Sequence, residues 1–389
     1  MSHLEDIKQY ARSCLADEIP SGQKHKWACQ RFLGDLDKIG TADFPYIWIE
    51  DNADKIVKWF SLLKHSKGAL AGKPIELNQW QKFRACQIYG WIHRETGKRR
   101  FRKSFTEVGR KNGKSQMESG EALYEIAIQA TKNMETYEVY TAGTKRDQSK
   151  IVFSECNLMT KGSILRSKFN FKRDEIVHIK TGSFIKPLSK EDGKTGDGTN
   201  PACLILDEYH QHPTTDFYDL GLGSNTKEPM LTIITTAGKD LTYPCYTQEY
   251  DYCSKVLDPD VDVKNDEYFI DICEADKGDD PGDLTTWQKA NPIRAFYDEG
   301  IKKIAEDYEI AKQIPEKMIA FMTKVLNIWV SAANNGYMDM KKWKACEVKE
   351  FPIDLKGRPV YIGFDMSSKI DLTSCLLYTS PSPRDRTRS

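Results

Sequence analysis

One short segment constrains the fold of this chain more than any other. A predicted strand over residues 102–108 runs into a glycine-containing loop, and a predicted helix follows over residues 116–130. Nucleotide phosphates bind a helix N-terminus with backbone N–H groups, a lysine charge and a hydroxyl for magnesium. The residues that we expect to bind the phosphates are Gly109, Arg110, Lys111, Asn112, Gly113, Lys114 and Ser115. The segment therefore predicts a phosphate-binding loop.

Different residues of the loop are expected to have different roles in binding the phosphates and the metal. Gly113 lets the backbone pass close to a phosphate, Lys114 reaches the β- and γ-oxygens, and Ser115 is placed for the metal. The loop departs from the usual phosphate-loop spacing, because Val108 stands where the first glycine belongs and Gly109 comes one residue late. Taken alone, the segment is equally compatible with a surface turn that carries an incidental Lys-Ser pair.

Three further apolar runs, each ending in a small or polar loop, indicate buried parallel strands of an α/β sheet. They cover residues 137–143, 202–208 and 231–238, and helical stretches separate them. Residues 283–330 are again helical in pattern, and a new strand is expected at 358–365. The predicted organisation is a helical N-terminal region (1–70), an ATPase domain (71–330), a linker (331–354) and the start of a second α/β domain (355–375).

Two acids end the run at 202–208. Asp207 at the strand end is placed to hold magnesium, through water or Ser115, and Glu208 to polarise the attacking water as a general base. An Asp-Glu pair can also be a solvated loop start, but its order after the phosphate loop favours an ATP-hydrolysing site. Thr235 and Thr236 end the next run and fit either a γ-phosphate sensor or an ordinary threonine-rich strand.

Composition and charge exclude several classes. Fifty-seven basic and fifty-seven acidic side chains cancel, so nucleic-acid contacts must come from local patches; the densest, residues 98–103, we interpret as a solvated turn before a strand. Ten cysteines lie singly, with no C-x-x-C spacing to suggest a zinc or redox site. Neither a signal-peptide core nor an apolar run of membrane-spanning length is found, so we expect cytoplasmic, reduced thiols and no membrane contact.

Several motifs, in this order, resemble those of large terminase subunits of tailed double-stranded-DNA phages. They are Trp80-Gln81, residues 90–97, the loop at 109–115, residues 140–148, residues 206–210, residues 235–238 and Ala290-Asn291-Pro292. The resemblance covers about residues 40–375, and the irregular loop matches the deviant phosphate loop of that family. It implies a RecA-like P-loop ATPase, using ATP and Mg²⁺, that pumps viral DNA into a procapsid, followed by an RNase H-like nuclease.

The resemblance also assigns individual residues. Gln81, alone or with Gln79, would recognise adenine, whereas an ordinary helix-surface amide is the alternative. Arg110, which could be a solvated charge, matches the family's loop arginine and is favoured as a finger on the transferring phosphoryl group. Residues 235–238 match the family's coupling motif.

The strand at 361–365 is similar to the first nuclease strand of the family. Asp365 would help to hold a pair of divalent ions, Mg²⁺ or Mn²⁺, for phosphodiester cleavage, and Asp371 is interpreted as structural. The remaining nuclease acids would lie beyond Cys375, so we expect this chain to lack a working nuclease. The implied partners are double-stranded DNA bound without sequence preference, the portal protein and the small terminase subunit. A homo-oligomeric ring in the host cytoplasm is implied as well.

Two alternatives remain for the nucleotide chemistry: a DNA helicase or recombination-type ATPase, and a non-catalytic nucleotide-binding regulator. A structural virion protein gives no reason for the phosphate loop. The last residues, 376–389, change abruptly to a Ser/Pro/Arg-rich composition. They can be interpreted as a disordered basic tail, but they resemble the conceptual translation of synthetic sequencing-adapter DNA. We therefore exclude them from the fold prediction.

Overall fold

The computed structural model describes residues 2–144, 146–188, 199–331 and 345, and the strands at 361–365 and 374–378. The chain divides into two compact units, Met1–Ala332 and Ala333–Ser389, which are described separately here. Among the described residues, no helix combines the length and the apolar character that crossing a bilayer requires.

The helices of the first unit include three near the N-terminus, where a helical region is predicted. The longer helices are α1 (His3–Leu15), α2 (Gln23–Asp37), α3 (Glu50–Ser61), α4 (Gln79–Gly90), α5 (Lys114–Tyr124), α7 (Arg146–Thr160), α12 (Asp298–Gln313) and α13 (Pro315–Lys324). The shorter ones are α6 (Ala130–Asn133), α9 (Asp216–Leu222), α10 (Asp251–Leu257), α11 (Leu284–Ala290), η4 (Tyr209–Gln211), η6 (Arg294–Phe296), η1 (Gly68–Leu70) and η3 (Arg166–Lys168). Two π-helical turns, η2 (Glu125–Gln129) and η5 (Cys245–Tyr250), precede α6 and α10.

Eight strands of the first unit form one sheet. They are β3 (Lys103–Glu107), β4 (Glu138–Ala142), β5 (Phe169–Phe171), β6 (Ile176–His178), β7 (Phe184–Pro187), β8 (Pro201–Asp207), β9 (Met230–Thr235) and β10 (Tyr268–Ile272). A separate antiparallel pair joins β1 (Tyr46–Trp48) to β2 (Trp91–His93). The sheet order is β10-β3-β9-β8-β4-β7-β6-β5, in which every pair from β10 to β7 is parallel and β6 is antiparallel to both of its neighbours.

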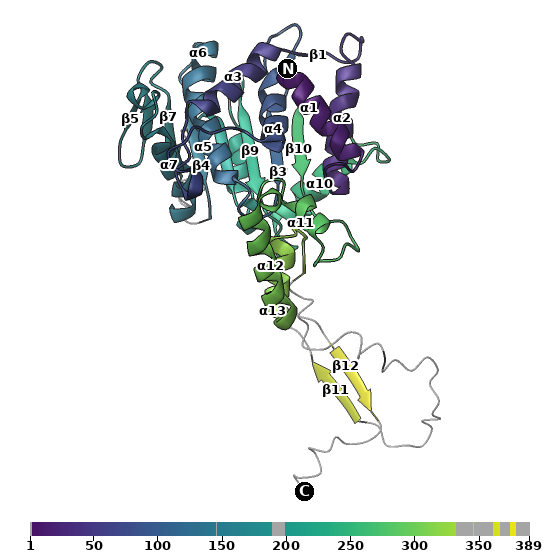
Figure 1. Cartoon of the computed structure of the whole chain (residues 1–389). Coiled ribbons are helices and arrows are strands. Elements are labelled where there is room, and N and C mark those ends of the chain that lie inside the picture. Colours follow the sequence, from purple (N-terminus) through teal and green to yellow (C-terminus); the bar gives the residue numbers. More distant parts are fainter. Residues whose placement is uncertain are drawn as a thin grey trace. The chain divides into compact units, whose positions relative to one another are not determined.

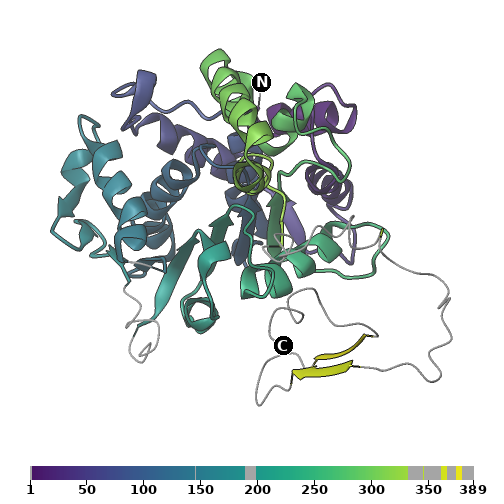
Figure 2. The ribbon, with the colours of Figure 1, turned by 90° about the horizontal axis from the view of Figure 1, so that it is seen from below.

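Helices cover both faces of the sheet (Figures 1 and 2). Successive side chains of a strand point to opposite faces, and β8 shows this directly. Cys203 and Ile205 belong to the core formed with α1, α3, α4, α5 and α7, whereas Leu204 and Leu206 belong to the core formed with α9, η5 and α10. All seven residues of β8 are buried, as expected for a parallel strand covered on two sides.

The predicted α/β class, the largely parallel sheet and the helical N-terminal region are confirmed. The sequence prediction did not include β10, which pairs with β3 at one end of the sheet, or the meander β5–β7 at the other end. The helices α1 and α2 lie toward the β10 side and the meander lies on the opposite side (Figure 1).

The interpretation of the basic run at 98–103 as a solvated turn is wrong for Arg99 and Arg100. Their side chains are only 5% and 1% exposed. Arg99 pairs with Glu125 at 2.6 Å, and Arg100 pairs with Asp35 at 2.7 Å. A buried cation needs a partner because burying an unpaired charge is costly. These two arginines therefore hold the fold together, whereas Lys98 and Arg102 of the same run are exposed.

The second unit contains strands β11 (Tyr361–Asp365) and β12 (Ser374–Tyr378), which pair antiparallel with Asp365 opposite Ser374. Asp365 is thus the last residue of its strand. Strand β12 also crosses residue 376, where the non-native tail was predicted to begin. Most of the predicted linker, and Asp371, lie outside the described residues.

Candidate nucleotide site

The carboxyl ends of β3, β8 and β9 meet at one edge of the sheet, where ligands of open α/β sheets bind. Strand β9 lies between the other two, so that Thr235 pairs with Glu107 on one side and Ile234 pairs with Asp207 on the other. This order brings together the three segments that the sequence analysis selected: the phosphate loop after β3, the acids after β8 and the threonines after β9.

The phosphate loop connects β3 to α5 through two positions that only a glycine can fill easily. Gly113 has φ +71° and immediately precedes Lys114, the first residue of α5. At Gly109, an added Cβ would lie 2.7 Å from Asn291 Oδ1 and 2.9 Å from the carbonyl oxygen of Ala290. Close packing against residues 290 and 291 therefore explains why a glycine stands at position 109. Lys111, which lies between Gly109 and Gly113, adopts φ +68°. A non-glycine residue in this conformation often marks a functional site.

The first half of the loop is tied to the helices that follow the sheet. The Gly109 N–H donates to the Ala290 carbonyl at 3.1 Å, and the Arg110 N–H donates to the Lys324 carbonyl at 2.8 Å. These two N–H groups are therefore not directed at a phosphate, contrary to the prediction that they contribute to a ring of donors. The second half of the loop, from Lys111 to Ser115, is left for that role.

The side chain of Asn112 shapes the loop, so a phosphate contact at this residue would come from its backbone. It is fully buried. Its Nδ2 donates to the Gly109 carbonyl at 2.8 Å and to Asn291 Oδ1 at 2.9 Å. Its Oδ1 accepts from the N–H groups of Ile293 at 3.1 Å and Arg294 at 3.0 Å. Both polar atoms are thus used within the protein, and the amide locks the loop onto residues 291–294.

Lys114 is bonded to the strand-end threonines. Its Nζ donates to Thr236 Oγ1 at 2.6 Å and to the Val108 carbonyl at 3.4 Å. The Thr236 hydroxyl donates in turn to the same carbonyl at 3.2 Å. The lysine is only 7% exposed. A threonine-rich strand end, for which the sequence left two interpretations open, is therefore in direct contact with the lysine of the phosphate loop.

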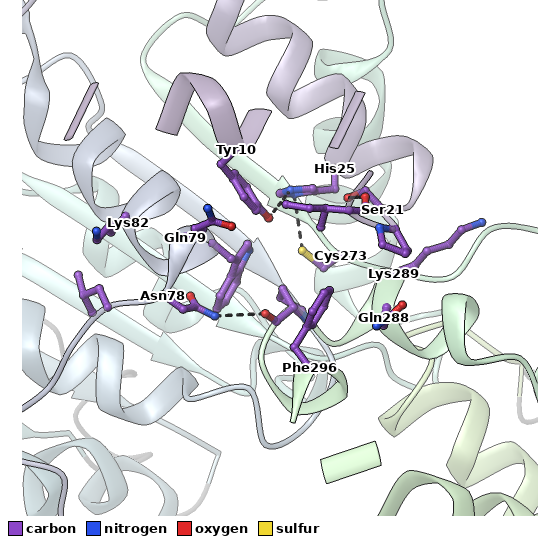
Figure 3. Close-up of a pocket in the computed structure, with 15 residues that line it drawn as sticks. Tyr10, Ser21, His25, Asn78, Gln79, Lys82, Cys273, Gln288, Lys289 and Phe296 are labelled. Atoms are coloured by element: carbon purple, nitrogen blue, oxygen red, sulfur yellow. Dashed lines mark hydrogen bonds between the residues drawn. The ribbon is translucent and has the colours of Figure 1, made fainter. Parts of the chain in front are cut away.

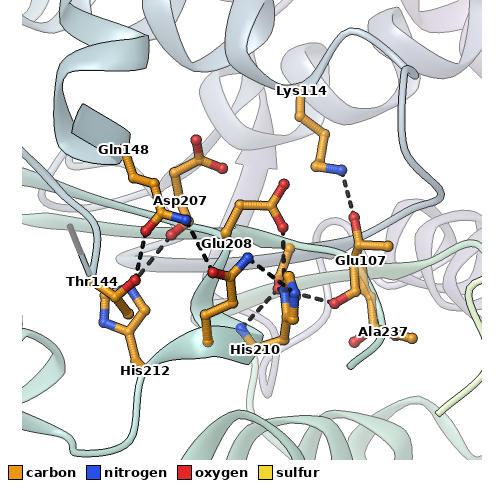
Figure 4. Close-up of polar contacts among 12 residues, drawn as sticks. Glu107, Lys114, Thr144, Gln148, Asp207, Glu208, His210, His212 and Ala237 are labelled. Carbon is orange, nitrogen blue, oxygen red and sulfur yellow. Dashed lines mark hydrogen bonds and ion pairs between the residues drawn. The ribbon is translucent and has the colours of Figure 1, made fainter. Parts of the chain in front are cut away.

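The two acids lie in different environments (Figure 4). Asp207 is 5% exposed, and burial together with the charge of Glu208 raises its pKa to about 7, against the lowering effect of Lys114. Glu208 is more accessible, at 19% of its side chain, and has φ +51°. The buried acid suits a metal ion, whose charge would repay the burial of the carboxylate, and the accessible acid suits proton transfer.

His210 connects Glu208 to Thr235 and was given no role from the sequence. Its Nδ1 lies 3.2 Å from Glu208 Oε2 and 3.0 Å from Thr235 Oγ1, and its backbone N–H donates to the same hydroxyl at 3.0 Å. Burial lowers the pKa of His210 to about 4, so the ring is neutral near pH 7. The sequence signal was its place at the end of the motif at 206–210, two residues after Glu208.

A third acid, Glu118, lies close to the site from helix α5. It is fully buried, and neither carboxylate oxygen has a hydrogen-bond partner within the described residues. Burial, and secondarily the charge of Asp207, raises its pKa well above the usual value. It lies one helical turn after Lys114, a spacing that puts both residues on one face of α5. The sequence analysis did not select it.

Arg110 is half-buried, and its guanidinium makes no hydrogen bond or ion pair with the residues that the structure describes. Its positive charge helps to lower the pKa of His210 and of Lys324, after the larger effect of burial in each case. The side chain is therefore close to the acids, which is compatible with the finger interpretation.

Gln81 is not a helix-surface amide, since it is only 5% exposed. Asn78 and Gln81 form a capping box at the start of α4, in which Gln81 Oε1 accepts from the Asn78 N–H at 3.1 Å. A methyl group added to Gly113 would lie 3.4 Å from Gln81 Nε2. Gln81 thus lies beside the phosphate loop, with its oxygen already used.

A cavity of about 340 Å³ opens beside this position (Figure 3). Asn78, Gln79, Pro292 and Phe296 are among the residues that line it. Asn78 Nδ2 donates to the Pro292 carbonyl at 3.2 Å, so the cavity adjoins the segment that Asn112 holds. Asp365, the remaining predicted ligand, belongs to the second unit.

Comparisons with known proteins agree on one family. The profile of the terminase large subunit ATPase domain matches residues 79–255, and the profile of the terminase large subunit endonuclease domain matches residues 262–381. The second match starts before β10, so it includes elements that pack within the first unit. It also extends past residue 376.

Among curated proteins, Protein YmfN of Escherichia coli (strain K12) is 33% identical over 203 residues, which are 49% of this chain and 42% of YmfN. Among solved structures, the HK97 bacteriophage large terminase superposes with a TM-score of 0.58 at 23% identity, covering 85% of this chain and 65% of that one. The large terminase of the thermophilic bacteriophage D6E in complex with ADP gives 0.42 at 10% identity, covering 72% and 60%. This chain thus spans less than two thirds of each relative's length, and the HK97 match supports a RecA-like ATPase fold.

Proposed function

This chain belongs to the family of terminase large subunits, and we propose that it hydrolyses ATP at the phosphate loop to drive the packaging of double-stranded DNA into a procapsid. The observation that carries the proposal is the meeting of three groups at one sheet edge. Lys114 is held by Thr236, while Glu208 is joined through His210 to the adjacent Thr235.

The residues present fit Mg·ATP. Gly113 precedes a helix N-terminus with Lys114 at its first position, and Asp207 is a buried carboxylate whose charge Lys114 favours within the described part of the chain. When bound, ATP supplies the phosphoryl group, and Mg²⁺ neutralises charge on its oxygens. We assign the phosphate contacts to the backbone from Lys111 to Ser115 and to Lys114, and the metal contacts to Ser115 and Asp207.

Glu208 acts as the general base in this proposal, with His210 as the positioning residue. A neutral His210 hydrogen-bonds Thr235 Oγ1 through Nδ1 at 3.0 Å, and the same nitrogen lies 3.2 Å from Glu208 Oε2, which accepts no hydrogen bond within the described residues and is therefore open to a water. Glu208 is then free to accept the proton of the attacking water. Arg110 is the candidate that stabilises charge on the transferring group, since its guanidinium is left unpaired by the rest of the described protein.

We place the adenine base at the end of the cavity lined by Asn78, Gln79, Pro292 and Phe296. Phe296 and Pro292 offer apolar faces for an aromatic ring, and Gln79 offers a donor and an acceptor. Gln81 can contribute only its Nε2 donors, because its Oε1 belongs to the capping box.

A route for coupling leads from the phosphate loop to the end of the first unit. Thr236 contacts Lys114, and the next residue, Ala237, donates its N–H to Asn327 Oδ1 at 2.7 Å. The Val330 N–H donates to the Gly238 carbonyl at 3.4 Å. A change at the γ-phosphate that releases Lys114 from Thr236 would therefore reach residues 327–330, which lead into the chain beyond. This supports the prediction of residues 235–238 as a coupling motif.

The wider assembly is part of the proposal. Double-stranded DNA, the portal protein, the small subunit and a ring of copies are expected from the family. Asp365 is proposed as one ligand of the two divalent metal ions of the nuclease, whose other ligands would lie beyond Cys375. The proposed location is the host cytoplasm.

The test is ATP turnover by the purified chain, with and without duplexes of unrelated sequence. We expect DNA to stimulate turnover equally for all duplexes and less at higher salt, because phosphate contacts release counterions. Lys114→Met should abolish turnover, whereas the exposed Lys98→Met should not. Turnover that survives in Lys114→Met contradicts the ATPase proposal, and a strong preference for one duplex contradicts the packaging role.

A further inference from the structure

Three sulfur atoms and one imidazole come together in the first unit, although their cysteines are far apart in the sequence. Cys14 ends the apolar face of α1, His25 and Cys29 lie one turn apart on α2, and Cys273 follows β10. All four side chains are at most 2% exposed. The absence of C-x-x-C spacing led the sequence analysis to expect no zinc site, because it could not see that α1 and α2 fold against each other.

We propose that Cys14, His25 and Cys29 bind one zinc ion. Cys29 Sγ lies 3.6 Å from His25 Nε2, and Cys14 Sγ lies 3.8 Å from the same nitrogen. In a tetrahedral zinc site, bonds of about 2.3 Å to sulfur and about 2.0 Å to nitrogen place these two ligand atoms about 3.5 Å apart. The three candidate ligand atoms all lie within 4.8 Å of one another. Both nitrogen–sulfur distances are thus close to the separation that coordination requires.

The far side of the imidazole ring is arranged as metal-binding histidines usually are. His25 Nδ1 lies 2.6 Å from Asp271 Oδ1, and the other oxygen of Asp271 accepts from Trp80 Nε1 at 2.8 Å. A carboxylate that accepts the Nδ1 proton leaves the lone pair of Nε2 directed at the metal. Asp271 is itself fully buried, so this position requires a partner for its charge.

Aromatic side chains pack on one side of the cluster, and the cavity of Figure 3 adjoins it through Tyr10 and His25. Tyr10, His25 and Phe83 pack as an aromatic group, with ring centroids between 5.5 and 5.8 Å apart. The Tyr10 hydroxyl is hydrogen-bonded to Nε2 at 2.9 Å, so on zinc binding it must release that nitrogen, and it is the side chain nearest to hand as a fourth ligand. Two thiolates balance the charge of a divalent zinc ion, which allows it to be buried. Cys273 lies on the Nδ1 side, at 3.7 Å from that nitrogen.

The site would fasten the N-terminal helices to the sheet. Its ligands lie on α1 and α2, and through His25 and Asp271 it reaches β10, the end strand of the sheet order. The site also adjoins the cavity in which adenine is placed, since Tyr10, His25 and Cys273 are among the residues that line it. We therefore expect zinc to stabilise the fold on which the nucleotide site is built without taking part in hydrolysis.

The test is the zinc content of the intact chain, purified from cells grown with added zinc sulfate and measured by mass spectrometry. We expect one zinc per chain, and a cobalt-substituted sample should show the absorption of tetrahedral thiolate coordination. Cys14→Ser and Cys29→Ser should each lose the metal, whereas Cys86→Ser, at a buried cysteine of α4, should keep it. Asp271→Asn should bind zinc about 10–100-fold more weakly in a chelator competition.

Two results would overturn the proposal. One is a wild-type chain that contains no more zinc than its Cys14→Ser and Cys29→Ser variants and shows no thiolate–cobalt absorption. The other is a Cys14–Cys29 disulfide, seen as two missing thiols when the unreduced, denatured protein is titrated. ATP turnover is not part of the readout, so the result is independent of the function proposed above.

Discussion

The phosphate loop and the thiol–imidazole cluster (Cys14, His25, Cys29) are two polar sites of the first unit, and they are built in different ways. The loop residues that we propose to face the phosphates are contiguous, from Lys111 to Ser115. The cluster takes its groups from two helices and orients them through a strand residue nearly 250 positions later. A local motif can be read from sequence spacing, whereas a cluster of this kind exists only after the helices pack.

The two sites differ less in the residues that hold their reactive groups in place. The phosphate loop depends on Asn291, Ile293 and Arg294, which follow Asn112 by about 180 residues. The cluster depends in the same way on Asp271. Each site therefore consists of a few reactive groups and of residues, distant in the sequence, that hold these groups in place. Only the reactive groups of the phosphate loop could be predicted from the sequence.

The largest predicted effect concerns Asn112, where the local motif and its distant support meet. Asn112→Ala leaves two N–H groups and two acceptors without their partners in a buried position. Each unmet group costs about 1–3 kcal/mol, so we expect a loss of roughly 2–5 kcal/mol in the free energy of unfolding. Urea unfolding of the variant measures it, with the exposed Asn170→Ala as a control that should change stability by less than about 0.5 kcal/mol. A loss as small as the control's would show that the loop is self-supporting.

A smaller effect is expected at Gln81, which belongs to α4 but lies beside Gly113. Gln81→Glu keeps an oxygen for the capping box, so helix stability should be preserved. It adds a negative charge near the expected phosphates, which should weaken ATP binding by about 1–2 kcal/mol, or roughly tenfold. Fluorescent-nucleotide titration would measure this, with the exposed Gln9→Glu as control. An unchanged ATP affinity in Gln81→Glu would contradict the placement of the phosphates near Gln81.

A third effect is a pH dependence at Glu107, at the end of β3. Burial and the charge of Glu274 raise the pKa of Glu107 well above 4.5, while Trp329 Nε1 donates to its carboxylate at 3.0 Å. The folded chain therefore binds this proton more tightly than the unfolded chain. The contribution of Glu107 to stability is present below about pH 4.5 and is lost as pH rises toward the folded-state pKa, by no more than about 1.4 kcal/mol per pH unit.

Glu107→Gln removes that titration. The stability of the variant relative to wild type should therefore rise between pH 5 and pH 8, as followed by urea unfolding at several pH values. The exposed Glu95→Gln should show no such trend. A flat difference for Glu107→Gln would mean that the carboxylate stays ionised in the folded protein, and that the local electrostatics of the phosphate loop differ from those described here.

Much of the fold could be predicted because buried parallel strands and amphipathic helices leave periodic patterns. The strands that end at Glu107, Asp207 and Thr235 were found in this way. Strand β10 was missed although its five residues are all buried, because nothing near Tyr268–Ile272 carried a motif to draw attention to it. The meander at 169–187 consists of strands of three or four residues, too short for a clear period.

The site was predictable where chemistry demands a particular residue, and not where packing decides. Lys114, Asp207 and Glu208 have side chains that the reaction itself requires. Glu118, His210 and Asn291 act through contacts that depend on how α5, η4 and α11 are placed. Arg99 and Arg100 show the opposite error, since a basic run looked solvated until its buried partners on other elements were known.

The measurement that tests the central claim most directly separates ATP binding from ATP hydrolysis in Glu208→Gln. Nucleotide affinity should stay near that of wild type, because Lys114 and the loop are untouched. Single-turnover hydrolysis should fall by about 10²–10⁴-fold, as expected for the loss of a general base. The exposed Glu95→Gln should match wild type in both. Hydrolysis in Glu208→Gln at the wild-type rate would contradict the assignment of the catalytic base, and with it the account of this site.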